Sequence, residues 1–366
     1  MKKQISREDF LKKGAAALAG VGLLATSCEE SEERTAPNII TNKSYQWRMV
    51  TTWPPNFPVV GIGCTRFADW VREMSGGRMD IQVYGGGELV PAMEAFDAVS
   101  SGAAEMGNGA AYYWAGKAPA AQFFATVPFG MDARQAQAWI ASGGGQALWD
   151  EVYEPFHVKS FVAGNTGTQM GGWFNREINR IEDFKGLKMR MPGIGAKVLS
   201  KVGATAVSVA GGEIYTSLET DVIDATEWIG PYHDYLMGFH KIAKYYYYPG
   251  WHEPGTILET MVNRPKFEAL PLDLQRIIEA ACNNQAIWTL AEFDAKNNDY
   301  LNKLKAEGVQ LRAFSPEILD ILKQNTQMVL EEMVASDPQA KKVYTAYKAF
   351  QTQASEWSNV AERSLI

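Results

Sequence analysis

Leu187-Lys188-Met189-Arg190-Met191-Pro192-Gly193 alternates apolar with cationic side chains before a Pro-Gly turn signal. This period of two predicts a short strand. Beyond the turn, residues 198–202 repeat apolar side chains at helical spacing, and residues 206–209 predict another strand. Strand, helix and strand in succession predict an α/β fold with parallel sheets.

The same alternation occurs on both sides of this stretch. Residues 46–53 and 79–84 predict two strands, and the helix between them ends at Gly76-Gly77. Residues 213–220 predict a helix that is followed by a strand over 222–228. From Leu270 onward the pattern changes to long amphipathic helices.

Length and composition restrict the class of protein further. A chain of 366 residues with 46% hydrophobic content is expected to form two lobes and not a single small domain. The formal charge of -7 and the lack of basic stripes argue against nucleic acid as a partner. An anionic small ligand would therefore need local positive groups.

The N-terminus has the order of an export signal. Lysines and Arg7 precede an uncharged run, so residues 1–27 are predicted to be a signal peptide. Ala25-Thr26-Ser27-Cys28 resembles a bacterial lipobox, which predicts a lipid on Cys28 and a tether over 28–44; the alternative is an ordinary cleavage site with an incidental cysteine. A twin-arginine-like segment has Glu8 in place of its second arginine, which leaves Sec and Tat export both open.

Templates for catalysis and for zinc binding find no match. The four histidines lack H-E-x-x-H spacing, no serine lies in G-x-S-x-G, and the glycine clusters do not complete a phosphate-binding motif. Cys64 and Cys282 are expected to be buried free thiols, although one disulfide is possible. The sequence therefore favours a binding protein over an enzyme.

Arg190 and Glu227 are the two charged residues whose positions indicate a site. Arg190 lies near the end of its predicted strand, where its guanidinium can hold a carboxylate with two parallel hydrogen bonds, but a structural ion pair or an exposed arginine fits the spacing equally well. Glu227 ends an apolar strand and needs a counter-charge. A hard cation prefers oxygen ligands, which Gln169, Glu253 and the carbonyl of Trp228 can supply.

Several motifs follow one another in the order of a known family. Lys188-Met189-Arg190-Met191-Pro192 precedes Val202-Gly203-Ala204, the segment 212–220 and Ile223-Asp224-Ala225. Together they resemble the receptor subunit of a tripartite ATP-independent periplasmic (TRAP) transporter. The motifs that resemble the branch for 2-oxo or 2-hydroxy monocarboxylates are Thr52-Trp53-Pro54, 87–91, 110–114, 164–167, 169–174 and 245–253.

The resemblance implies a two-lobed periplasmic-binding-protein fold with a hinge, long connecting helices and C-terminal helices. Lobe I would span residues 45–166 plus about 256–300, and lobe II would span 167–255 plus about 301–366. Arg190 would hold the carboxylate of the acid beside a sodium or calcium ion. The implied cation ligands are Gln169, Glu227, the Trp228 carbonyl and Glu253, and Asn165, Tyr112 and Tyr113 would complete the substrate pocket.

The implied partners are the acid, the membrane subunits of the transporter and, through Cys28, a bacterial membrane. The resemblance also implies that the C-terminal helices pair two protomers. The alternatives are a receptor for C4-dicarboxylates or other organic acids, a metal-assisted oxo-acid enzyme and a structural lipoprotein without a working pocket. Arg190→Ala is expected to abolish binding and leave the fold intact. Asp221 replaces a family glycine, and the rings of 245–248, Trp251 and His252 are expected to serve packing.

Overall fold

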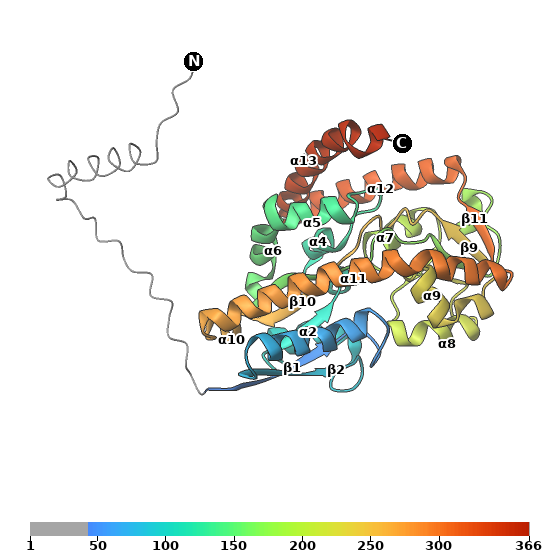
Figure 1. Cartoon of the computed structure of the whole chain (residues 1–366). Coiled ribbons are helices and arrows are strands. Elements are labelled where there is room, and N and C mark those ends of the chain that lie inside the picture. Colours follow the sequence, from blue (N-terminus) through green and yellow to red (C-terminus); the bar gives the residue numbers. More distant parts are fainter. Residues whose placement is uncertain (1–42, 366) are drawn as a thin grey trace, which may run out of the picture. The chain divides into compact units, whose positions relative to one another are not determined.

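A computed structural model describes residues 43–365 of the chain (Figure 1), so the predicted signal peptide, Cys28 and most of the tether lie outside the described residues. The helices and strands divide between two sheets. We call the first sheet with its helices lobe I and the second sheet with its helices lobe II. Within residues 43–365, no helix combines the length and the hydropathy that a membrane span requires.

The first sheet has five strands. In spatial order they are β2 (Met79–Tyr84), β1 (Tyr45–Thr51), β3 (Met106–Gly109), β10 (Ile257–Asn263) and β4 (Val158–Asn165). The second sheet has six strands. In spatial order they are β11 (Gln310–Ala313), β9 (Tyr245–Tyr248), β5 (Gly172–Phe174), β8 (Ala225–Thr226), β6 (Lys188–Arg190) and β7 (Thr205–Val207).

The prediction of parallel sheets is wrong for one strand of each sheet. β10 runs antiparallel to β3 and β4, and β5 runs antiparallel to β8 and β9, whereas the other pairings are parallel. Each reversed strand is the first one after the chain crosses between the lobes: β4 precedes β5, and β9 precedes β10. Neighbouring strands run parallel when a helical crossover within the sheet joins them. A strand that arrives from the other lobe has no such crossover and can enter in the opposite direction.

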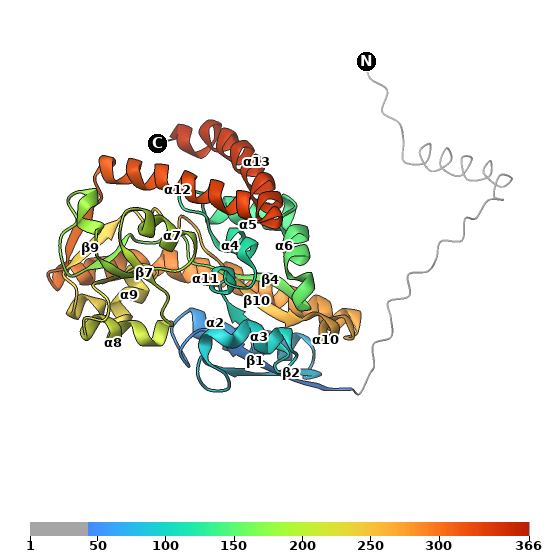
Figure 2. The same ribbon diagram turned by 180° about the vertical axis from the view of Figure 1, so that it is seen from behind.

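Helices cover the sheets and connect the lobes (Figures 1 and 2). The 35-residue helix α11 (Leu272–Ala306) contacts α2 and β4 of lobe I as well as α9 of lobe II. α12 (Pro316–Ser336) contacts α7 of lobe II, and α13 (Pro338–Val360) contacts α4, α5 and α6 of lobe I. The remaining α-helices are α2 (Val60–Met74), α3 (Ala95–Ser100), α4 (Gln122–Ala125), α5 (Ala133–Ser142), α6 (Gly145–Tyr153), α7 (Gly193–Lys201), α8 (Ile214–Glu219), α9 (Pro231–Met237) and α10 (Arg264–Glu268).

Local sequence signals explain where several helices begin and end. The Asp132 side chain accepts a hydrogen bond from Gln135 N, and the Gln135 side-chain oxygen accepts one from Asp132 N, which forms a capping box at the start of α5. Ser315 caps α12 ahead of Pro316 at its first position. Asp221, which replaces the family glycine, adopts the left-handed conformation with φ 57°.

Another local prediction needs correction. The strand expected over 222–228 is only Ala225–Thr226 long, because Val222 faces solvent and the chain leaves the sheet at Glu227. In β9, the adjacent side chains of Tyr246 and Tyr247 are both buried and pack as expected. Trp173 stacks on Tyr246 and Phe314 stacks on Tyr247, so both faces of this strand are covered.

The two cysteines within residues 43–365 are free and buried, as predicted. Cys64 lies in α2 and Cys282 lies in α11, two helices that contact each other. Burial raises the pKa of the Cys64 thiol to about 12. These thiols are therefore uncharged packing groups at neutral pH.

Candidate functional site

Two segments that cross between the lobes lie side by side and place the predicted cation ligands. Gln169 N donates to the Glu253 carbonyl at 3.1 Å, and Gly250 N donates to the Gln169 carbonyl at 3.0 Å. A Cβ atom at Gly250 would lie 2.1 Å from the Gln169 carbonyl oxygen, so only glycine permits this approach. The paired crossing segments form a hinge candidate that carries Gln169 on one side and His252 and Glu253 on the other.

Arg190, at the end of β6, is fully enclosed. Its side chain is 1% exposed and forms an ion pair with Glu227, whose side chain is also 1% exposed. The guanidinium carbon lies 5.2 Å from the Trp228 ring centroid, and Nη2 donates to the Tyr113 hydroxyl at 3.3 Å. Burial is the largest single influence and opposes the charge on Arg190, but Glu227 and the neighbouring Tyr113, Tyr112 and Glu253 together raise the arginine pKa, so the cation persists.

This burial contradicts the prediction that Arg190→Ala would leave the fold intact. Removing the guanidinium would leave the Glu227 carboxylate buried without its counter-charge, which typically costs several kcal/mol. Arg190 therefore serves the fold of lobe II as well as any ligand.

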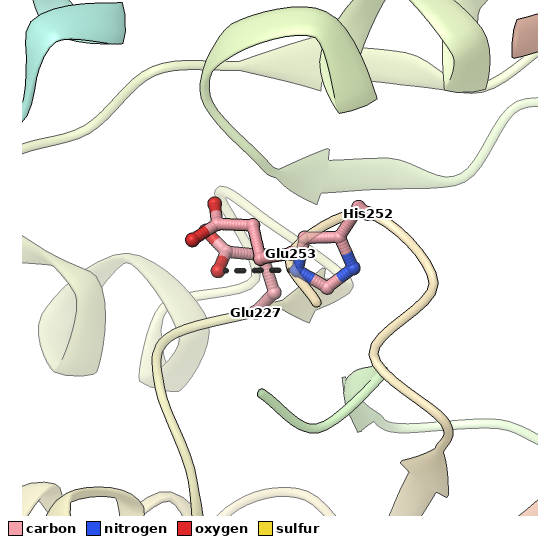
Figure 3. Close-up of side chains that lie close together, drawn as sticks. All are labelled: Glu227, His252 and Glu253. Carbon is pink, nitrogen blue, oxygen red and sulfur yellow. Dashed lines mark ion pairs between the residues drawn. The ribbon is translucent and has the colours of Figure 1, made fainter. Parts of the chain in front are cut away.

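Glu227, His252 and Glu253 form a compact cluster of ionisable side chains (Figure 3). One possible ligand atom from each lies within 4.8 Å of the others, and all three residues are buried. His252 Nε2 lies 3.5 Å from Glu227 Oε2. Burial and the neighbouring Glu227 charge raise the pKa of Glu253 well above its ordinary value. Two such carboxylates are stabilised by a proton or by a cation between them.

Amide groups beside this cluster have unused hydrogen-bonding atoms. Gln169 Nε2 donates to Glu253 Oε2 at 2.7 Å and to Thr166 Oγ1 at 3.1 Å, but the buried Gln169 Oε1 has no partner within residues 43–365. Asn165, at the end of β4, accepts from Gly167 N at 2.8 Å through Oδ1, while its buried Nδ2 has no described partner. Neither ring nitrogen of His252 forms a hydrogen bond within the described residues, although Nε2 lies 3.5 Å from Glu227 Oε2. Buried polar atoms of this kind call for an explanation.

Aromatic side chains of lobe I close the site from the opposite side. Tyr112 and Tyr113 lie on the short helix Ala111–Trp114, with ring centroids 4.8 Å apart in an edge-to-face arrangement. Burial and the carboxylates of the cluster raise the pKa of Tyr112 well above its ordinary value. Trp53 contacts both the Tyr113 and the Trp228 rings. These rings provide apolar walls with protonated hydroxyl groups.

The structure thus brings most of the sequence-predicted residues into contact with one another. Arg190 contacts Glu227, Trp228 and Tyr113; Gln169 contacts Glu253; and Glu253 lies beside Glu227. His252 was assigned to packing, but it lies in the cluster, and its position next to Glu253 was the only signal in the sequence. Trp251 stacks on Phe129 and does pack as expected.

A groove between the lobes lies near the site. It has a volume of about 570 Å³ and is bounded by Thr52, Pro54, Pro55, Gly86, Gly87 and residues 89–93 of lobe I and by Ser208, Ala210, Gly212 and Glu213 of lobe II. Gly211, between the lining residues Ala210 and Gly212, packs against the Trp228 ring, where a Cβ atom would lie 2.5 Å from a ring carbon. The predicted ligand-binding side chains do not line the groove. The Trp228 ring contacts Arg190 and Gly211, and Gly211 is the chain neighbour of two lining residues.

The chain is similar to a known family, to a curated protein and to solved structures. The family "bacterial extracellular solute-binding protein, family 7" (DctP) matches residues 49–337. A monocarboxylate 2-oxoacid-binding periplasmic protein of Nostoc sp. is 40% identical over 360 residues, which is 98% of each chain.

Two solved structures are similar in both sequence and fold. A TRAP periplasmic solute-binding protein of Colwellia psychrerythraea, with bound calcium and pyruvate, is 43% identical with a TM-score of 0.85, over 88% of this chain and 99% of that one. Its counterpart from Pseudoalteromonas atlantica, with bound sodium and pyruvate, is 42% identical with a TM-score of 0.86, over 88% of this chain and 98% of that one.

Proposed function

Because the chain belongs to the family 7 bacterial extracellular solute-binding proteins of TRAP transporters, we propose that it is a periplasmic receptor for a short 2-oxo or 2-hydroxy monocarboxylate. The acid, pyruvate-like or lactate-like, binds together with a calcium or sodium ion. The protein then presents its closed form to the membrane subunits of the transporter. Relatives of known ligand that are 40% to 43% identical support this ligand class.

The single observation that carries the proposal is the contact between the buried Arg190 and Glu227, whose buried carboxylate lies beside that of Glu253. Arg190 is the one cation in contact with the cluster among the described residues, and its Nη2 faces Tyr113. A carboxylate between this guanidinium and the Tyr113 hydroxyl receives charge-assisted hydrogen bonds. The short alkyl group of the acid then rests against the rings of Trp53, Tyr112 and Trp228.

The donor set fits a hard cation. Glu227, Glu253 and the unpartnered Gln169 Oε1 offer oxygen atoms, and the Trp228 carbonyl adds a backbone oxygen. The hydrogen bond from Gln169 Nε2 to Glu253 turns the amide so that its oxygen is free for the cation. A bound cation would neutralise the two carboxylates and would polarise the second oxygen of the acid, while Asn165 Nδ2 remains free to donate to the ligand.

Closure of the lobes follows from where these groups lie. Tyr112, Tyr113 and Asn165 belong to lobe I, Arg190 and Glu227 belong to lobe II, and Gln169 and Glu253 lie on the crossing segments. A ligand that contacts all three parts favours the closed form over the open one. The receptor therefore works by a shift in the closed population, without bond chemistry.

A thermal-unfolding screen tests the ligand class. The mature protein is heated with 2-oxo acids, 2-hydroxy acids, C4-dicarboxylates, sialic acid or amino acids, each with and without a chelator in sodium-free buffer. A ligand at 100 times its Kd adds about 2.7 kcal/mol of stability. We expect stabilisation only by short 2-oxo or 2-hydroxy acids and only with a cation. Stabilisation by dicarboxylates alone would overturn the ligand class, and no stabilisation by any acid would overturn the receptor function.

We also propose that a lipid on Cys28 anchors the mature chain to the membrane. The small residues before Cys28 and the polar tether that follows support this proposal. Cys28→Ser should move the protein from the membrane fraction to the soluble periplasmic fraction. An unchanged distribution would contradict the anchor.

A homodimer through the C-terminal helices is a further part of the proposal. Trp357 and Val360 on α13 are 62% and 73% exposed, an unusual position for large apolar side chains. Light scattering should give the mass of two chains for the mature protein and of one chain for Trp357→Glu. A monomeric wild type would contradict this arrangement.

A further inference from the structure

His233 lies in α9 at the end of a chain of contacts that starts at Arg190. From this geometry, and resting on the receptor function above, we propose that His233 is a positioning residue: it fixes the Trp228 ring over the ligand-binding arginine and bonds this ring to lobe I when the lobes close. His233 contacts neither the acid nor the cation in this assignment. Its effect is on how long the closed, ligand-binding form persists.

The hydrogen bonds of His233 define its tautomer. The Trp228 Nε1–H group donates to His233 Nδ1 at 3.0 Å, so Nδ1 carries no proton. The other ring nitrogen, Nε2, lies within hydrogen-bonding distance of the Pro58 carbonyl and therefore carries the proton that it donates. The residue is fully buried, and both nitrogens are satisfied. A neutral histidine thus joins a tryptophan of lobe II to a backbone carbonyl of lobe I.

The Trp228 ring is held on three sides. The Arg190 guanidinium lies over it at 5.2 Å from the ring centroid, Gly211 packs against its edge, and the His233 ring lies parallel to it within 5°. Because the ring is held by the hydrogen bond from its Nε1–H to His233, loss of that acceptor lets it rotate. Rotation would remove one of the contacts that orient the arginine.

The lobe I side of the contact is shaped by a strained turn. Val60 N donates to the Pro58 carbonyl at 2.7 Å across Val59, whose φ of 56° and ψ of -70° place it at the centre of a γ-turn. A β-branched residue seldom adopts this conformation. The Phe57 ring packs edge-on against both His233 and Trp228. The turn therefore presents a carbonyl and an aromatic edge to the same two rings of lobe II.

These contacts run continuously from Arg190 through Trp228 and His233 to Pro58. Separation of the lobes breaks the contacts of His233 and Trp228 with residues 57–58, since these belong to different lobes. The same contacts must break before a ligand on Arg190 is released. Removing the histidine bonds should therefore speed release far more than it slows capture.

The test compares His233→Phe, which keeps a ring but loses both hydrogen bonds, with His233→Gln, which retains a donor and an acceptor. Stopped-flow tryptophan fluorescence with pyruvate and saturating calcium measures both rate constants. We expect koff to rise about tenfold in His233→Phe with kon within about twofold, and His233→Gln to recover part of the loss. His240→Phe is the matched control, because His240 also stacks on an aromatic ring of lobe II, Tyr235, but has no partner in residues 54–59.

A second readout does not depend on the ligand. Hydrogen exchange of the amides in residues 57–63 should be faster in unliganded His233→Phe than in wild type or His240→Phe. If His233→Phe does not fold, Phe57→Leu, which weakens the contact from lobe I, should raise koff and exchange in the same direction. Unchanged koff together with unchanged exchange would overturn the assignment. A wild type that binds no acid would instead refute the receptor function and leave the exchange result to decide the role of His233.

Discussion

Glu259 in the first sheet and the pair of Glu227 and Glu253 beside the second sheet are equally buried, yet their surroundings differ. The oxygens of Glu259 accept from Trp114 Nε1 at 2.7 Å, from the Tyr153 hydroxyl at 3.0 Å and from Ser160. These donors are neutral, and the residues around Glu259 leave its oxygens satisfied. Glu227 and Glu253 face a full positive charge and several polar atoms without described partners.

This difference distinguishes a structural carboxyl group from a binding one. Burial raises the pKa of Glu259 to about 7 despite its hydrogen bonds, so the group gains or loses its proton near neutral pH. Glu227 instead pairs with the buried guanidinium of Arg190, and its cluster holds polar atoms without described partners. Retaining a buried charge with incomplete hydrogen bonding costs stability. Such an arrangement is expected at a binding site, where the ligand supplies the missing hydrogen bonds.

The largest effect should come from breaking the buried ion pair. Arg190→Gln leaves Glu227 without its counter-charge, so we expect the free energy of unfolding to fall by about 3–5 kcal/mol. We also expect the variant to lose acid binding completely. The double variant Arg190→Gln, Glu227→Gln should regain stability but not binding. Urea denaturation and calorimetry measure the two quantities. A single variant that still binds the acid would remove Arg190 from the site.

The next effect concerns pH and the structural carboxyl group. The pKa of Glu259 rises from 4.5 to about 7 on folding, so the folded state favours the protonated form. Its contribution is fully present below pH 4.5 and is lost as the pH rises through about 7, on the order of 3 kcal/mol. Glu259→Gln should lack this loss, so its stability relative to wild type should rise between pH 5 and pH 8. A pH-independent difference would contradict the assigned pKa.

The smallest of these effects should separate binding from stability at the cluster. Glu253→Gln keeps the side-chain shape and removes a carboxylate whose charge is opposed by burial and by Glu227. We expect about tenfold weaker acid binding at limiting calcium, together with equal or greater stability at pH 8. Glu259→Gln is the matched control and should bind the acid with unchanged affinity. Loss of stability without loss of affinity in Glu253→Gln would make Glu253 a structural residue.

The sequence was sufficient for the family and for the α/β class, and both are confirmed. Strand periodicity placed Arg190 near the end of β6. The motifs shared with a family predicted Gln169, Glu227 and Glu253 as members of one cation site. The direction of β5 and β10 did not follow from the sequence. Local periodicity reports a strand but not the side from which the chain enters its sheet.

Two parts of the site also escaped prediction for physical reasons. His252 lies in an irregular crossing segment, where no period distinguishes a packing side chain from one that faces a cluster. The burial of Tyr246 and Tyr247 depends on Trp173 and Phe314, which come from distant parts of the chain. The full enclosure of Arg190 similarly depends on Tyr113 of the opposite lobe.

The most direct test of the receptor function is titration calorimetry of pyruvate into the mature protein, with calcium present and then in chelated, sodium-free buffer. The account predicts one pyruvate per protomer with calcium and much weaker binding without a cation. Equal affinity in both buffers would remove the cation from the site, and no binding in either would contradict a receptor for short oxo acids.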